Sequence, residues 1–150
     1  MSDKILLTAE HITKEFPASQ GRTLTACNDI NLNLYQGKTL GIVGESGSGK
    51  STFVKMIVNI LKPTQGRILY EGQDITKLKG EKLRQLRPKI QMVFQDTGTA
   101  FHPKMKVVDI VTEPLLNFGR IRRSEKAEKA RELLRMVELP ESYADRYPHS

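Results

Sequence analysis

Cysteine and long apolar runs are nearly absent from this sequence, and each absence removes a class of protein. The single cysteine, Cys27, excludes an internal disulfide and a metal site built from several cysteines. We expect its thiol to be a small buried group. No run approaches the roughly 18 apolar residues of a membrane-spanning helix, and residues 1–4 lead into a mixed segment unlike a signal peptide. These absences predict a protein that stays in the cytosol.

Acidic residues are fewer than basic residues in this sequence. Asp and Glu number 17 against 24 Lys and Arg, which gives a formal net charge of +7. This balance suits nucleotides, nucleic acid or an anionic membrane surface as partners, and charge alone does not choose among them. Hydrophobic residues at 38% and charged residues at 27% fit a globular chain rather than a disordered one. The length of 150 residues indicates one domain.

Apolar periodicity and turn residues divide the chain into the strands and helices of an α/β protein. Strands are predicted at residues 4–8, 29–35, 39–43 and 90–94, a hairpin at 64–75, and helices at 52–61, 78–87, 107–118 and 124–139. The short apolar runs 39–43 and 90–94 are typical of strands buried in a parallel sheet. Ser124 can cap the last helix, and the tail from residue 140 is predicted to be a loop.

Residues 44–51, with the sequence GESGSGKS, fit the phosphate-loop pattern G-x-x-x-x-G-K-[ST]. Its glycines let the backbone come close to a ligand, and successive N–H groups can point inward as an anion nest. The helix that follows adds the positive end of its dipole. Lys50 supplies a charge for the β- and γ-phosphates, and the Ser51 hydroxyl can bind Mg²⁺. A predicted strand before the loop and a helix after it are the context that this motif requires.

Several segments, in order along the chain, resemble the ABC-type ATPases, especially those of oligopeptide and dipeptide importers. Residues 41–52, 66–75 and 90–96 are similar to the phosphate loop, the following hairpin and the entry to the Q-loop of that family. Residues 113–115 (Glu-Pro-Leu) and 146–149 (Arg-Tyr-Pro-His) are similar to segments of the peptide-importer branch. The resemblance covers nearly all of the chain.

The resemblance implies roles for individual residues. Phe16 would stack on adenine, the alternative being a core phenylalanine. Gln95 would contact Mg²⁺ and the attacking water, the alternative being a solvated loop residue. Lys50 and Gln95 would act in catalysis, Ser51 and Gln95 would bind the metal, and Thr52 would lie near the α-phosphate. The residues expected to contact ATP are Phe16, Gly44, Ser46, Gly47, Ser48, Gly49, Lys50, Ser51, Thr52 and Gln95.

The resemblance also implies an architecture and partners. The fold would be an α/β P-loop NTPase core with a mostly parallel sheet and an N-terminal antiparallel β lobe, to about residue 106, followed by the start of a helical lobe at 107–150. Such an ATPase closes head-to-tail with a second ATPase on MgATP, and this closure drives membrane-spanning permease subunits. A separate binding protein delivers the peptide. The expected location is the cytoplasmic face of the plasma membrane, as a peripheral subunit.

The sequence departs from the family in two respects. His102 stands where the family usually has an asparagine, which weakens the assignment of the transported substrate. No partner ligands lie at a spacing that would give His102 a zinc site. The signature motif, the acidic strand end with the catalytic glutamate and the switch histidine do not occur up to Ser150. We therefore expect this exact chain to bind MgATP weakly or not at all, to lack hydrolysis, and to be marginally soluble because its sheet is incomplete.

Three other readings remain. A phosphate-loop GTPase would need an Asn-Lys-x-Asp motif, which is absent, and a small-molecule kinase would lack the segment around Gln95. An ABC-superfamily ATPase acting on nucleic acid is compatible with the basic residues 120–123, but residues 113–115 and 146–149 favour a transporter, so no nucleic-acid partner is expected. The third reading is a non-functional, truncated remnant of a transporter ATPase.

Overall fold

The chain forms two compact units. The structure, a computed structural model, describes residues 4–95 and 101–148. The boundary between the units lies between Met92 and Val93. The first unit contains a β-sheet and two helices, and the helices of the second begin at Val107. The division near residue 106 that the sequence favours stays a prediction.

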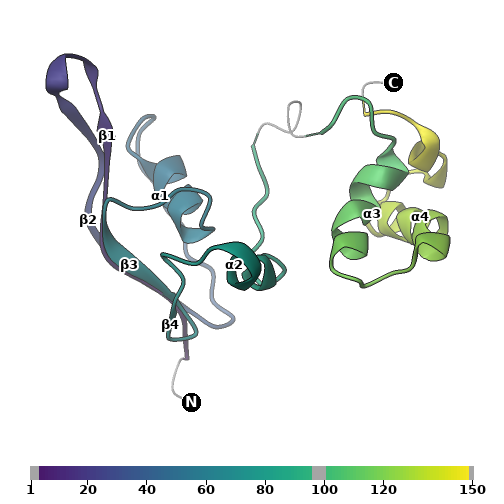
Figure 1. The fold of residues 1–150 in the computed structure, drawn as a ribbon, viewed down its shortest axis with the longest axis horizontal. Helices are drawn as coiled ribbons and strands as arrows, with labels where there is room; N and C mark the ends of the chain where they lie inside the picture. Colours follow the sequence, from purple (N-terminus) through teal and green to yellow (C-terminus); the bar gives the residue numbers. More distant parts are fainter. Residues whose placement is uncertain (1–3, 96–100, 149–150) are drawn as a thin grey trace. The chain divides into compact units, whose positions relative to one another are not determined.

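The first unit is built on an antiparallel sheet with the strand order β2-β1-β3-β4. Its strands are β1 (Ile5–Pro17), β2 (Thr23–Tyr35), β3 (Gln65–Tyr70) and β4 (Gln73–Asp74). The central strand β1 pairs with β2 along its whole length, but with β3 only from Leu7 to Thr13. The far ends of β1 and β2 therefore continue past β3 as a two-stranded ribbon, seen in purple in Figure 1.

β1 and β2 are each much longer than the predicted segments 4–8 and 29–35. Leu7 and Ala9 are buried at alternate positions, and then the alternation breaks, because Ile12 and Thr13 are both buried. Between Ala9 and Ile12 the pairing with β2 changes register, and His11 has a positive φ of 51°. A bulge of this kind shifts the phase of a strand without ending it. The period-two pattern alone therefore could not show that the strand continues.

The core of the first unit lies between the sheet and the two helices α1 (Lys50–Ile57) and α2 (Gly80–Leu86). Its most deeply buried large side chains are Ile12, Met56, Ile68 and Ile75. Burying one such side chain contributes about 1.5–3 kcal/mol. Cys27 belongs to the same cluster and is 4% exposed, which confirms the prediction of a buried thiol.

The two segments predicted as buried parallel strands are not strands in the described residues. Residues 39–43 and 90–94 have no ladder partner, and Val43 and Val93 are 93% and 94% exposed. An apolar run becomes a buried strand only where neighbouring strands satisfy its backbone N–H and C=O groups and cover its side chains. Within residues 4–95 and 101–148 all strand pairing is antiparallel.

The second unit packs α3 (Val107–Asn117), α4 (Lys126–Met136) and the short 3₁₀ helix η3 (Glu141–Asp145) around a small core. Buried side chains of this core are Ala130, Leu134 and Ala144. η3 lies where the sequence indicated only loop. No helix in the described part of the chain is long and apolar enough to cross a bilayer.

The helix predicted at 124–139 is shorter, and Ser124 does not cap it. A 3₁₀ turn at Arg123–Glu125 precedes α4, and the Glu125 carboxylate accepts a hydrogen bond of 2.6 Å from the Arg122 backbone N–H. Lys126 then pairs with Asp109 of α3, an ion pair that joins the two helices. The acidic side chain at 125 takes the capping role because it can reach back to a free N–H at the helix start.

Candidate functional site

The phosphate loop is held against strand β2 by Gly49, the residue that caps α1. Gly49 has a φ of +86°, a conformation that other L residues adopt at a cost. A Cβ at this position would lie 2.1 Å from the Ala26 carbonyl oxygen, far inside a van der Waals contact. The Phe53 N–H donates to the Gly49 carbonyl at 2.9 Å and closes the first turn of the helix. The loop can therefore take this path only with glycine at position 49.

Lys50, the first residue of α1, folds its side chain back over the loop. Its Nζ donates to the carbonyl oxygens of Gly44 at 2.7 Å and Glu45 at 2.5 Å, and to the Ser48 Oγ at 3.1 Å. The ammonium is thus held by three uncharged oxygens of the loop itself. A charged phosphate oxygen is a stronger acceptor for an ammonium than these. The geometry leaves Lys50 ready to exchange loop oxygens for phosphate oxygens.

A cavity of about 270 Å³ joins this loop to the β1–β2 ribbon. Its lining from the ribbon is Phe16, Leu24 and Ala26, and its lining from the loop and α1 is Gly47, Ser48, Gly49, Lys50, Ser51 and Thr52. Phe16 and Leu24 are directly opposite each other in the pairing of β1 with β2. One end of the cavity is therefore apolar and aromatic, and the other presents hydroxyls, an ammonium and the start of a helix.

The structure brings most of the predicted site residues together. Phe16 and residues 47–52 line one cavity, whereas Gly44 and Ser46 belong to the loop but are outside its lining. Gln95 is exposed and belongs to the second unit, so its contact with Mg²⁺ and water stays a prediction. Leu24 was missed, because only the register of the ribbon shows that it faces the same cavity as Phe16.

The surroundings of the loop fit an anionic ligand. The Cys27 sulfur lies 3.7 Å from the Gly49 carbonyl, and burial raises the pKa of this thiol, which keeps it uncharged beside the loop. The Ser51 hydroxyl is in the cavity lining beside Lys50 and can act as an oxygen ligand for Mg²⁺. The missing Cβ of Gly49 lets the loop lie directly against Ala26 of β2, which places the N-terminus of α1 at the cavity.

The far end of α1 is fixed by two basic side chains that sequence reasoning did not identify. Arg87 donates to the Val58 carbonyl at 2.7 Å. Lys62 donates to the Asn59 Oδ1 at 2.5 Å and to the Thr76 carbonyl. Burial, and then the charge of Lys79, lowers the pKa of Lys62. This network ties the C-terminal end of the helix to the segment that follows β4.

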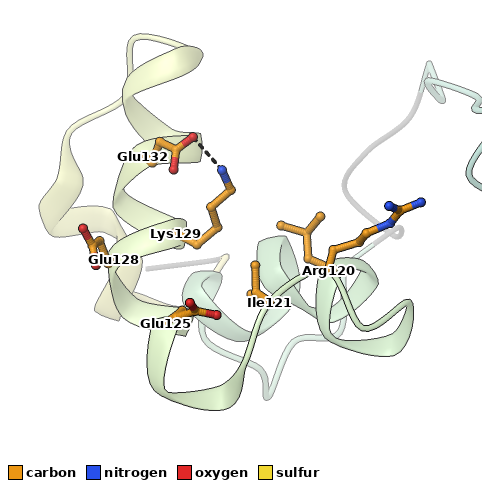
Figure 2. A pocket seen from close by; sticks show the side chains of 7 residues that line it. Arg120, Ile121, Glu125, Glu128, Lys129 and Glu132 are labelled. Carbon is orange, nitrogen blue, oxygen red and sulfur yellow. Dashed lines mark hydrogen bonds and ion pairs between the residues drawn. The ribbon is translucent and has the colours of Figure 1, made fainter.

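The second unit has a separate groove of about 550 Å³ (Figure 2). It is lined by Leu115, Arg120, Ile121, Glu125, Glu128, Lys129 and Glu132. Figure 2 shows Lys129 and Glu132 of α4 joined in an ion pair, of 2.6 Å, while the Arg120 side chain points away from α4. None of these residues belongs to the predicted nucleotide site.

Comparisons with known proteins agree in the family that they identify. The model of the family described as "ABC transporter" matches residues 27–150. The chain is 40% identical, over 99% of its length, to a probable peptide ABC transporter ATP-binding protein, y4tS, of Sinorhizobium fredii, of which it covers 43%. It is also 40% identical, over 99% of its length, to the oligopeptide transport ATP-binding protein AppF of Bacillus subtilis, of which it covers 47%. The chain thus spans less than half the length of these two relatives.

A solved structure gives a similar result for the fold. The ATP-binding cassette MJ0796, in a dimeric post-hydrolysis state bound to ADP and Pi, matches with a TM-score of 0.84 and 30% sequence identity. The match covers 96% of this chain and 62% of that one. At this similarity the path of the chain through sheet, loop and helices is shared, although residues 39–43 and 90–94 are unpaired here.

Proposed function

This chain belongs to the ABC transporter family and has the fold of its ATPase cassettes, and from this premise we propose that it binds ATP with Mg²⁺ as part of the ATP-binding subunit of a peptide importer. The family membership and the peptide-transport names of its relatives support the class of protein. The proposed nucleotide site consists of this chain's own residues at the phosphate loop and the β1–β2 ribbon.

The observation that carries the proposal is the single cavity that unites an aromatic ring with a phosphate loop. Phe16 lies at its apolar end, and Gly47 to Thr52 lie at its polar end. ATP has the same division, with a flat base at one end and a chain of phosphates at the other. A phosphate loop without the ring would suit any polyphosphate, and the ring adds a surface on which a base can stack.

Each end of the cavity performs a separate task in binding. The loop N–H groups and the N-terminus of α1 attract the phosphates. Lys50 releases the Gly44 and Glu45 carbonyls and donates to phosphate oxygens instead. The Ser51 hydroxyl would hold Mg²⁺, and the ion would neutralise charge on the phosphates. Phe16 receives the base, and Leu24 covers its edge.

Hydrolysis requires a group that orients water, and we propose Gln95 for part of this task. Its uncharged amide can both donate to and accept from a water or a metal-bound ligand. Among the described residues that line the cavity there is no Asp or Glu to act as a general base. We therefore propose that the 150-residue chain on its own binds MgATP weakly, the upper end of what its sequence led us to expect, and does not hydrolyse it.

The proposed assembly follows the family. The chain would close head-to-tail with a second cassette, and together they would work on membrane-spanning permease subunits at the cytoplasmic face of the membrane. A separate binding protein would deliver the peptide. The dimeric state named for the solved cassette and the names of the relatives support these partners. Co-purification with a permease from its native membrane would test them.

A tryptophan introduced at the ring position tests the nucleotide site directly. The sequence contains no tryptophan, so Phe16→Trp introduces a single tryptophan whose emission can be excited apart from that of the tyrosines. We expect MgATP to quench its emission by stacking and Mg-tripolyphosphate, which has no base, to leave it almost unchanged. Lys50→Met in the same background should abolish the response to MgATP. A response that is equal for both ligands, or that survives the loss of Lys50, would contradict the proposed site.

A further inference from the structure

The Phe16 ring is in contact with a cation as well as with the cavity. The Lys14 ammonium lies over this ring, with its nitrogen 5.0 Å from the ring centroid. This is within the distance at which the negative face of an aromatic ring attracts an ammonium. Phe16 is part of the cavity lining, whereas Lys14 is not. One part of the ring surface therefore meets the ammonium and another part meets the cavity.

The ring has little else to hold it. β1 pairs with β3 only as far as Thr13, so Phe16 lies on the two-stranded ribbon that projects past the rest of the sheet (Figure 1). Its cross-strand neighbour, Leu24, is 62% exposed and gives it only partial cover. A two-stranded ribbon without a third strand is only marginally stable by itself. A ring in this position keeps more conformational freedom than one in a packed core.

Within residues 4–95 and 101–148 the Lys14 ammonium makes no hydrogen bond and no ion pair that would compete with its contact to the Phe16 ring. The contact therefore restrains the ring without drawing it toward a carboxylate. A side chain that is already ordered loses less entropy when a ligand binds to it.

We propose that Lys14 is a positioning residue for the nucleotide base: its ammonium holds the Phe16 ring so that the surface facing the cavity stays open for stacking. This inference rests on the proposed ATP site. It predicts that Lys14 strengthens the binding of ligands that carry a base and has no effect on a bare phosphate chain. A lysine acting on the phosphates through its charge would strengthen both kinds of ligand.

The test compares the binding of two ligands to the unaltered whole chain and to its variants by titration calorimetry, with NMR titration where binding is millimolar. Lys14→Met removes the charge and keeps much of the side-chain length, and Lys14→Arg keeps a cation that can lie over the ring. We expect Lys14→Met to weaken MgATP binding about two- to fivefold, the equivalent of one exposed cation–π contact. Binding of Mg-tripolyphosphate should not change. Lys14→Arg should restore the affinity for MgATP.

Lys38→Met is the matched control. Lys38 is an exposed lysine of the same unit, and its substitution also removes one positive charge. It should leave both affinities unchanged. Three results would each overturn the inference. Lys14→Met could weaken the binding of both ligands equally, it could leave the affinity for MgATP unchanged, or Lys14→Arg could bind MgATP as weakly as Lys14→Met does.

Phe16→Leu separates this outcome from a failure of the nucleotide site. If the ring stacks on the base, Phe16→Leu weakens MgATP binding and spares tripolyphosphate, and Lys14→Met adds nothing further in that background. If Phe16→Leu has no effect, or the unaltered chain binds neither ligand, the proposed site fails and the inference fails with it. If Phe16→Leu acts as expected and Lys14→Met does not, only the inference fails.

Discussion

Replacing Gly49 by alanine tests how the phosphate loop is held against the sheet. The added Cβ would lie 2.1 Å from the Ala26 carbonyl oxygen, which belongs to the backbone of β2 and cannot swing aside as a side chain could. The φ of +86° adds about 1–2 kcal/mol for any L residue with a Cβ. Forcing one carbon into a packed contact typically costs about 1–3 kcal/mol more. We expect Gly49→Ala to lower the free energy of unfolding by about 2–5 kcal/mol.

Gly47→Ala is the matched control within the same loop. Gly47 has a similar φ of +81°, but a Cβ there would meet no atom within 4 Å. Its substitution therefore carries the conformational cost and no clash. The difference between the two variants isolates the close approach to β2, which we expect to account for about 1–3 kcal/mol.

Urea denaturation followed by circular dichroism measures both variants, because the midpoint and slope give the free energy of unfolding. MgATP titration on the same samples shows whether the loop keeps its binding geometry. Gly49→Ala should unfold at a clearly lower urea concentration than Gly47→Ala. Equal midpoints for the two variants would refute the idea that contact with Ala26 fixes the loop.

Three further predictions concern single side chains of the first unit. Lys50→Met should weaken MgATP binding at least about tenfold in equilibrium dialysis, because a charged hydrogen bond to phosphate is lost; an unchanged affinity would contradict its role. Arg87→Met should lower the unfolding free energy by about 1–3 kcal/mol in urea, because the Val58 carbonyl loses its 2.7 Å donor; a midpoint equal to that of the unaltered chain would argue against it. A hydrogen bond from the Thr76 side chain is the main cause that lowers the pKa of Asp74 below its usual 3.8, so this carboxylate stabilises the fold above that pH and the gain is lost as pH falls through the lowered pKa. In Asp74→Asn the midpoint of urea unfolding should therefore fall less steeply as the pH is lowered than in the unaltered chain. The same decrease at acid pH in both proteins would refute this.

The phosphate loop was predictable from sequence because its chemistry is local. Gly44 to Ser51 lie within eight consecutive residues, and α1 starts at Lys50, as the motif requires. Residues 107–118 likewise showed helical periodicity, and α3 spans Val107–Asn117. In a helix each residue bonds to one four positions away, so local sequence carries most of the information.

The strands were predicted less well because a strand depends on residues that are distant in sequence. The ribbon reaches Pro17 and Thr23 through pairing between β1 and β2, although its outer part lacks apolar alternation. Residues 39–43 have the composition of a buried strand, yet they are unpaired in the described part of the chain. Composition can favour an extended backbone, but only a neighbour supplies the hydrogen bonds that make it a strand.

The sequence by itself determined the family, the phosphate loop and the presence of an aromatic residue suited to a base. Only the tertiary structure placed Phe16 and Leu24 at the same cavity as the loop, set Gly49 against Ala26, and laid the Lys14 ammonium over the ring. The physical reason is that each of these contacts joins the loop or the ring to a partner whose position is set by the register of β1 and β2. That register includes a bulge near His11, and it is decided by packing of the whole sheet rather than by any local run of residues.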